Sequence, residues 1–150
     1  MEVKISGFAS EGNIPSKYTC DGDNASPGIE IKDENKTGFY AIVLNDPDAP
    51  SGLFTHWIIY NLPAGNNAIK GGQKRLEVTG DGYYQGINDF KKIGYDGPCP
   101  PSGVHRYFFM VYRLSEPVNK KAIRPDEIYK LLKGKKAEFS IYALYKRVRI

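Results

Sequence analysis

In the stretch Asp46-Pro-Asp-Ala-Pro-Ser-Gly-Leu-Phe-Thr-His-Trp57, two prolines, two aspartates and one histidine lie between two apolar segments, residues 39–45 and 58–62. Each proline fixes its own φ at about −65° and steers the preceding residue away from helix, so the connection is expected to be stiff. Polar groups on a rigid loop are typical of binding sites. We therefore expect two strands joined by a loop that carries functional side chains.

Most of the remaining periodic segments also predict strands. They are residues 3–8, 29–32, 55–62, 107–114 and 137–145. Residues 39–45 are apolar on both faces, as expected for a strand that is covered on both sides. Regular alternation along 55–62 would place His56 on the face of Ile58, Tyr60 and Leu62, with Trp57 on the other face.

Residues 125–132 are the best helix candidate. Pro125 stands in the first turn, Asp126 and Glu127 lie at the positive end of the helix dipole, and Gly134 follows the last turn. Strands outnumber helices, and no helix separates neighbouring strands. The sequence therefore predicts an antiparallel β-sandwich with one or two peripheral helices, and residues 1–150 as a single domain.

Composition limits the classes of function. With 41% hydrophobic and 25% charged residues the chain is typical of a soluble globular protein, and a net charge of +4 gives no reason to expect nucleic acid as a partner. The basic segments 130–136 and 146–149 are interpreted as solvated charged faces. No apolar run could cross a bilayer and no signal peptide is visible, which favours the cytoplasm. Cys20 and Cys99 would be thiols in a reducing compartment, and a single bridge between them is possible from the sequence alone.

A second proline-braced stretch, Gly97-Pro-Cys-Pro-Pro-Ser-Gly-Val-His-Arg-Tyr107, precedes the apolar strand 107–114. His105 and Tyr107 are two residues apart at the start of that strand, so they point to one face. The chain has two histidines, and both lie at the start of a strand. Both stretches could therefore contribute to one cavity.

These stretches resemble the signature of the phosphatidylethanolamine-binding protein family, and further segments resemble its bacterial and archaeal, Raf-kinase-inhibitor-like branch. The motifs are Asp46-Pro-Asp-Ala-Pro50, His56-Trp57 and residues 97–107, together with Tyr18-Thr-Cys-Asp-Gly22, Ser26-Pro27 and Gly86-Ile-Asn-Asp-Phe90. The sequence departs from the family at Gly28 and Ile31, where members usually carry Pro and Trp.

The resemblance implies a large central antiparallel sheet packed on a smaller one, and a small pocket for phosphate or phosphoethanolamine-like head groups of phospholipids. Carried over to this sequence, the ligand-binding residues would be Asp46, Asp48, Pro50, His56, Pro100, Pro101, His105 and Tyr107. Members act as modulators of kinases or proteases rather than as enzymes, so we expect no catalysis, no cofactor and no metal. A homodimer is compatible with this branch.

Two aspartates would repel a phosphate by several kcal/mol at an effective dielectric constant of about 20. Three features could offset that repulsion: a proton on the phosphate, whose second pKa is about 6, an imidazolium held by an aspartate, or an ammonium group on the ligand. Each makes affinity depend on pH near neutrality. We expect binding of a phosphate ester to strengthen from pH 8 to pH 6.

Other interpretations remain open at this point. A hydrolase could combine an aspartate and a histidine with Ser51, Ser102 or Cys99, although no Gly-x-Ser-x-Gly elbow is present. Two histidines and a carboxylate could bind a divalent metal. Partner binding could instead use the long glycine-rich segment 63–96, which has no strong periodicity.

Overall fold

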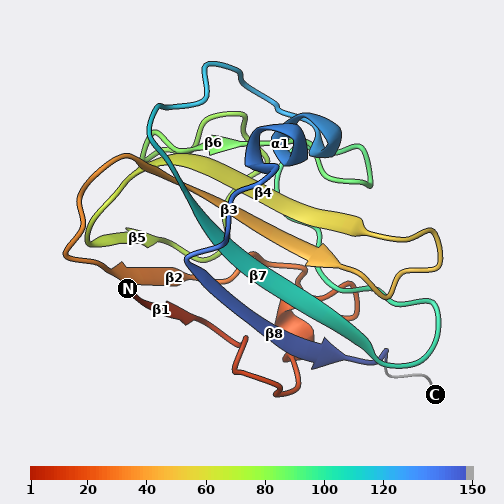
Figure 1. Ribbon diagram of the computed structural model, residues 1–150. Helices are drawn as coiled ribbons and strands as arrows, with labels where there is room; N and C mark the ends of the chain where they lie inside the picture. The colour runs from red at the N-terminus through yellow and green to blue at the C-terminus, as the bar shows by residue number, and fades with distance from the viewer. Residues whose placement is uncertain (148–150) are drawn as a thin grey trace.

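The computed structural model describes residues 1–147, which form two antiparallel sheets and one α-helix (Figure 1). The larger sheet has the order β6 (Tyr84–Gln85), β4 (Phe54–Pro63), β3 (Phe39–Asp46), β7 (His105–Leu114) and β8 (Phe139–Tyr145). The smaller sheet has the order β1 (Glu2–Ile5), β2 (Ile29–Lys32) and β5 (Asn67–Ile69). A short 3₁₀ turn covers Ser16–Tyr18, and α1 covers Pro125–Leu132.

This architecture confirms the predicted β-sandwich with a large and a small sheet. The helix has the predicted bounds, and all the predicted strands form, with shifts of a few residues at their ends. β5 and β6 were not predicted, and both lie in the glycine-rich segment 63–96. The end of the basic segment 146–149 lies outside the described residues. Among those described, no helix is long and apolar enough to span a bilayer.

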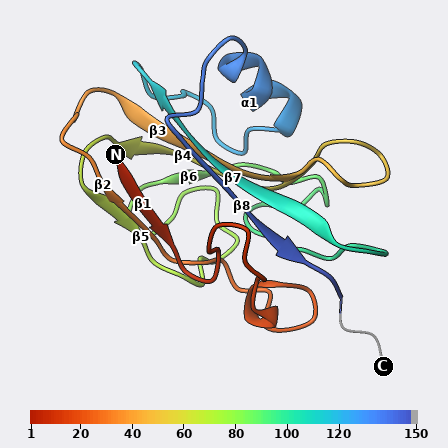
Figure 2. The ribbon, with the colours of Figure 1, turned by 60° about the horizontal axis from the view of Figure 1, so that its bottom comes forward.

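The large sheet is covered on both faces, with the small sheet on one side and α1 on the other (Figure 2). The core between the sheets includes Ile29, Ile42, Leu44, Trp57 and Phe109, all nearly inaccessible to solvent. On the other face Ile128 and Leu132 of α1 pack against β3 and β4, at a cluster that includes Ala41, Val43, Ile58 and Tyr60. Burial on both faces explains why residues 39–45 are continuously apolar.

Two bulges in β4 overturn the predicted alternation of its side chains. Leu44 pairs with Trp57 and Asn45 with Thr55, so His56 is an extra residue without a partner on β3. A second irregularity leaves Asn61 unpaired, with φ of 62°. Each bulge shifts the alternation by one residue. As a result His56 and Leu62 lie on the face of Trp57, toward the small sheet, whereas Ile58 and Tyr60 keep the opposite face, toward α1, as predicted.

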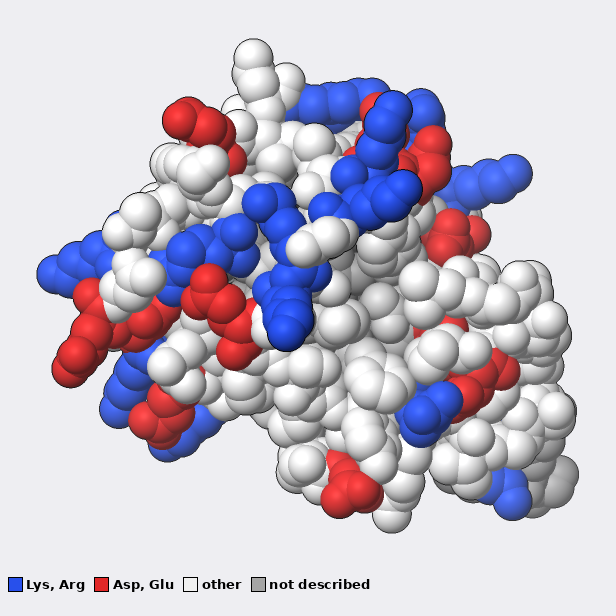
Figure 3. Space-filling view, in the orientation of Figure 1, with Lys and Arg blue, Asp and Glu red and all other residues white. Residues whose placement is uncertain are grey.

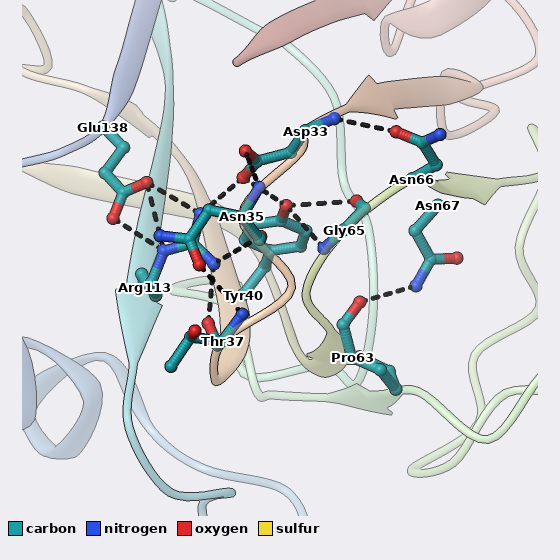
Figure 4. Close-up of polar contacts among 10 residues, drawn as sticks. All are labelled: Asp33, Asn35, Thr37, Tyr40, Pro63, Gly65, Asn66, Asn67, Arg113 and Glu138. Carbon is teal, nitrogen blue, oxygen red and sulfur yellow. Dashed lines mark hydrogen bonds and ion pairs between the residues drawn. The ribbon is translucent and has the colours of Figure 1, made fainter.

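The Arg113 cluster, defined here as Arg113, Asp33, Glu138 and Tyr40, closes the end of the sandwich where β7 finishes (Figure 4). The guanidinium of Arg113 binds the carboxylates of Asp33 and Glu138 and lies 5.2 Å from the ring centroid of Tyr40. Its Nη1 also donates to the carbonyl of Thr37, at 2.6 Å. This cluster ties β2, β3, β7 and β8 together at the end opposite His105.

Candidate functional site

The topology of the large sheet brings the two proline-braced stretches together. β3 lies between β4 and β7 and is antiparallel to both, so its last residues lie beside the first residues of both neighbours. Asp46 pairs with Phe54, and Asn45 pairs with both Thr55 and Phe108. The loop that follows β3 and the loop that precedes β7 therefore meet at one end of the sheet, where β3 ends and β7 begins, on the right in Figure 1.

A cavity of about 240 Å³ lies at this end of the sheet. It is lined by all of the predicted ligand-binding residues except Asp48. The lining consists of Asp46, Ala49, Pro50, Ser51, Phe54, His56, Phe90, Cys99, Pro100, Pro101, His105 and Tyr107. The walls are largely proline and aromatic side chains, and the ionisable groups among them are one carboxylate, two imidazoles and one phenol.

Asp46 and His105 form a buried pair on adjacent strands. His105 Nδ1 lies 2.6 Å from Asp46 Oδ2, and both side chains are less than one-tenth exposed. The other carboxylate oxygen, Oδ1, accepts a hydrogen bond of 2.7 Å from the Asp48 backbone. Since an ionised carboxylate only accepts, His105 Nδ1 is the donor of the pair. The other ring nitrogen of His105, Nε2, is left for a ligand.

His56 is directed to this cavity by the bulge in β4. Thr55 hydrogen-bonds to Tyr129 of α1 and so faces the helix, which turns His56 to the opposite face, where its ring lies edge-on to Tyr107 at 5.4 Å between centroids. Its Nδ1 lies 2.7 Å from the backbone oxygen of Asp96. Burial lowers the pKa of His56, although that carbonyl and the Asp46 carboxylate act in the opposite direction.

Tyr107 supplies the third polar group of the cavity. Within residues 1–147 its hydroxyl is the buried side-chain group that lacks a hydrogen-bond partner. Burial and the nearby Asp46 carboxylate raise the pKa of Tyr107, so the phenol keeps its proton. Leaving a buried hydroxyl unpaired costs about 1–3 kcal/mol, and a ligand that accepts its hydrogen bond would recover that cost.

Asp48, predicted as a ligand-binding residue, is placed outside the cavity lining. Its carboxylate accepts hydrogen bonds from the backbone and from the guanidinium of Arg106, at 2.8–2.9 Å. The hydrogen bond from Arg106 is the main cause that lowers the pKa of Asp48 to about 2. Asp48 therefore fastens the loop after β3 to β7.

Several residues outside the cavity lining hold the cavity in shape, and the sequence analysis did not identify Asp96, the central one. Asp96 accepts two hydrogen bonds from Arg75 and one each from Asn24 and Asn88, while its backbone positions His56. The disulfide between Cys20 and Cys99, a possibility that the sequence analysis left open, also joins the cavity wall to the segment after the 3₁₀ turn. The Gly86–Phe90 motif marked the region of Asn88 in the sequence, but no pattern marked Asp96.

The geometry gives little support to the hydrolase and metal interpretations. Cys99 is consumed in the disulfide, and Ser102 does not line the cavity. In the described part of the chain, no serine, threonine or cysteine side chain hydrogen-bonds to either imidazole, as an activated nucleophile would. No group of three or more potential metal ligands occurs among the described residues.

Comparisons with known proteins agree with this architecture. The family model described as "Phosphatidylethanolamine-binding protein" matches residues 4–146. A UPF0098 protein of Methanothermobacter thermautotrophicus is 38% identical over 98% of this chain and 99% of its own length. One from Aquifex aeolicus is 42% identical, over 98% of this chain and 89% of its own length.

Two solved structures share the fold. Escherichia coli YbcL, described as a member of the mammalian PEBP family, aligns with a TM-score of 0.84 and 25% identity, covering 98% of each chain. A phosphatidylethanolamine-binding protein homologue from Chlamydia trachomatis aligns with a TM-score of 0.79 and 26% identity, covering 99% of this chain and 97% of its own. This chain belongs to the phosphatidylethanolamine-binding protein family.

Proposed function

We propose that this protein is a non-enzymatic binding protein whose cavity takes a small ligand through a phosphate-like anionic group, such as a phosphomonoester or a phosphoethanolamine-like head group. One observation carries the proposal. The two histidines of the chain and Tyr107 line one cavity, and a buried carboxylate braces one of the imidazoles. Modulation of a kinase or protease partner stays a prediction from the family resemblance.

The Asp46–His105 pair explains how an acidic cavity can accept an anion. At an effective dielectric constant of about 20, two unit charges 4 Å apart interact by about 4 kcal/mol, so Asp46 alone would repel a phosphate strongly. When His105 carries a second proton, its Nδ1–H stays on Asp46 and its Nε2–H can donate to the ligand. The charged groups near this imidazolium are then Asp46, the ligand and, outside the lining, the Asp48–Arg106 pair.

The face of the molecule drawn in Figure 3 carries few basic side chains where the loop after β3 lies. In Figure 3 lysine and arginine side chains gather around α1, with acidic side chains among them, whereas the right-hand side, where the loop after β3 lies in Figure 1, is mostly uncharged. On this face few surface cations lie near the cavity, which favours the groups within the cavity as the source of anion affinity.

Binding of methyl phosphate is expected to strengthen about tenfold between pH 8 and pH 6, because the complex holds a proton on His105 or on the ligand. Isothermal titration calorimetry in buffers of different ionisation enthalpy would measure both the dissociation constant and the proton uptake. Affinity that is flat or weaker toward pH 6, or binding without proton uptake, contradicts the proposal.

A pair of matched variants separates this mechanism from simple repulsion. Asp46→Asn removes a negative charge from the cavity, yet we expect it to weaken methyl phosphate binding about tenfold at pH 7, since the imidazolium loses its charged partner. Asp48→Asn removes the same charge from the same loop outside the lining and should weaken binding clearly less than Asp46→Asn does. Tighter binding by Asp46→Asn would mean that the carboxylate only repels the ligand.

A further inference from the structure

The hydrogen bond between His56 and Asp96 fixes which nitrogen of the ring carries a proton. Its partner is a backbone carbonyl, which can only accept, so His56 Nδ1 must be the donor. In a neutral ring the proton is then on Nδ1, and Nε2 presents a lone pair. The hydrogen bond found for this ring is at Nδ1, and the ring lines the cavity, so Nε2 is the nitrogen available to a ligand there.

The surroundings of His56 favour this neutral form. The residue is 3% exposed, between the rings of Phe54, Phe90 and Tyr107. Burial lowers its pKa, against the opposing effects of the Asp96 and Gly97 backbone and of the Asp46 and Asp96 carboxylates. His105 differs, because its Nδ1 faces the carboxylate of Asp46 rather than a backbone carbonyl.

We propose that His56 is the specificity-determining residue of the cavity and selects anions that carry a hydrogen-bond donor over anions that can only accept. The inference rests on the proposed function and names the ligand class within it. The monoanion of a phosphomonoester has one P–O–H group, whereas a phosphodiester and a sulfate ester of the same charge have none. The cavity would therefore distinguish phosphomonoesters from both.

The donors and acceptors of the cavity match such a monoanion. A ligand oxygen can accept from His105 Nε2–H, and the P–O–H group can donate to His56 Nε2. An anion without a donor would turn a lone pair toward that of His56, or would require a proton on a ring whose burial disfavours it. Leaving buried polar groups unpaired is how a binding site rejects an analogue of the same shape.

Three small probes without an amino group test this inference on the unmodified protein: methyl phosphate, methyl sulfate and dimethyl phosphate. At pH 6 each is available as a monoanion, and only methyl phosphate carries the hydroxyl. Calorimetric titration is expected to give dissociation constants at least about tenfold higher for methyl sulfate and dimethyl phosphate than for methyl phosphate. Equal affinity for all three overturns the inference and leaves the proposed function standing, whereas no binding of any probe overturns both.

The variant His56→Gln tests whether His56 is the group responsible for this selectivity. A glutamine amide can turn either its oxygen or its NH₂ group toward the ligand, so the preference for methyl phosphate over methyl sulfate should shrink to a few-fold. An unchanged preference in a folded His56→Gln protein would assign the selectivity to another group and overturn the inference. If the variant does not fold, the comparison of the three probes on the unmodified protein still decides.

Discussion

Removing the Cys20–Cys99 disulfide is expected to lower the free energy of unfolding by about 4 kcal/mol and the melting temperature by about 10 °C. The two cysteines are 79 residues apart, so the bridge closes a long loop in the unfolded chain and restricts its conformational entropy strongly. Cys20 is exposed and Cys99 is half-buried, so serine can replace both without leaving an apolar cavity.

Thermal unfolding of the Cys20→Ser/Cys99→Ser variant, followed by circular dichroism, measures this effect. Reduced wild-type protein is the matched control and should melt together with the double variant. Because Cys99, Pro100 and Pro101 line the cavity, methyl phosphate affinity should fall in both. A melting temperature within about 2 °C of the oxidised protein would show that the bridge adds little beyond the local hydrogen bonds. These bonds include Cys20 N–H to Pro98 O and Gly97 N–H to Asn24 Oδ1.

Replacing Arg113 by methionine should lower the free energy of unfolding by about 2–3 kcal/mol, the second large effect that the structure predicts. The side chain of Arg113 is 12% exposed and that of Asp33 is 8% exposed, so the carboxylate would be left largely buried without its partner. Methionine keeps much of the apolar stem that packs on Tyr40, which limits the change to the lost hydrogen bonds and charge.

The pH dependence of stability provides an independent test of the role of Arg113. Burial would raise the pKa of Asp33, but hydrogen bonds from Tyr40, the Asn35 backbone and Arg113 outweigh it and lower the pKa overall. A depressed pKa contributes stability that is present above the pKa of the unfolded chain and is lost as pH falls through the folded value. Arg113→Met should therefore weaken the dependence of stability on pH in the acid range below about pH 4.

Arg106→Met is the matched control for Arg113→Met. Arg106 lies on the same strand and also binds a carboxylate, that of Asp48, but its side chain is 48% exposed. Exposed ion pairs contribute little because solvent screens them, so the melting temperature should change little. Equal losses from Arg113→Met and Arg106→Met in denaturant titrations would show that burial of the Arg113 cluster is not the cause.

The sequence predicted the parts of this fold that depend on local chemistry. Apolar runs marked the strands, and the proline and acidic residues at its start marked α1. The two proline-braced stretches marked the loops at the cavity. The family resemblance identified most of the cavity lining. Antiparallel pairing of β3 with both β4 and β7 then explains why residues near positions 46, 56 and 105 meet.

The features that sequence could not predict depend on tertiary context. The bulge at His56 arises from the register between β3 and β4, and it moves His56 from the face of Ile58, which simple alternation assigns, to the face of Trp57. Asp48 is drawn out of the cavity lining by Arg106, because the start of β7 places a guanidinium and a backbone N–H beside it. β5 and β6 are only three and two residues long, too short for a periodic signal.

The most direct test of the binding account is a long-range ¹H–¹⁵N spectrum of the imidazoles during titration with methyl phosphate at pH 6. The chain has two histidines, so the signals of His56 and His105 can be assigned with one variant of each. The account predicts that His56 shows the Nδ1–H tautomer, and that the Nε2 signals of both rings shift with one shared dissociation constant. Binding that leaves both rings unchanged, or a His56 ring protonated on Nε2 alone, would contradict it.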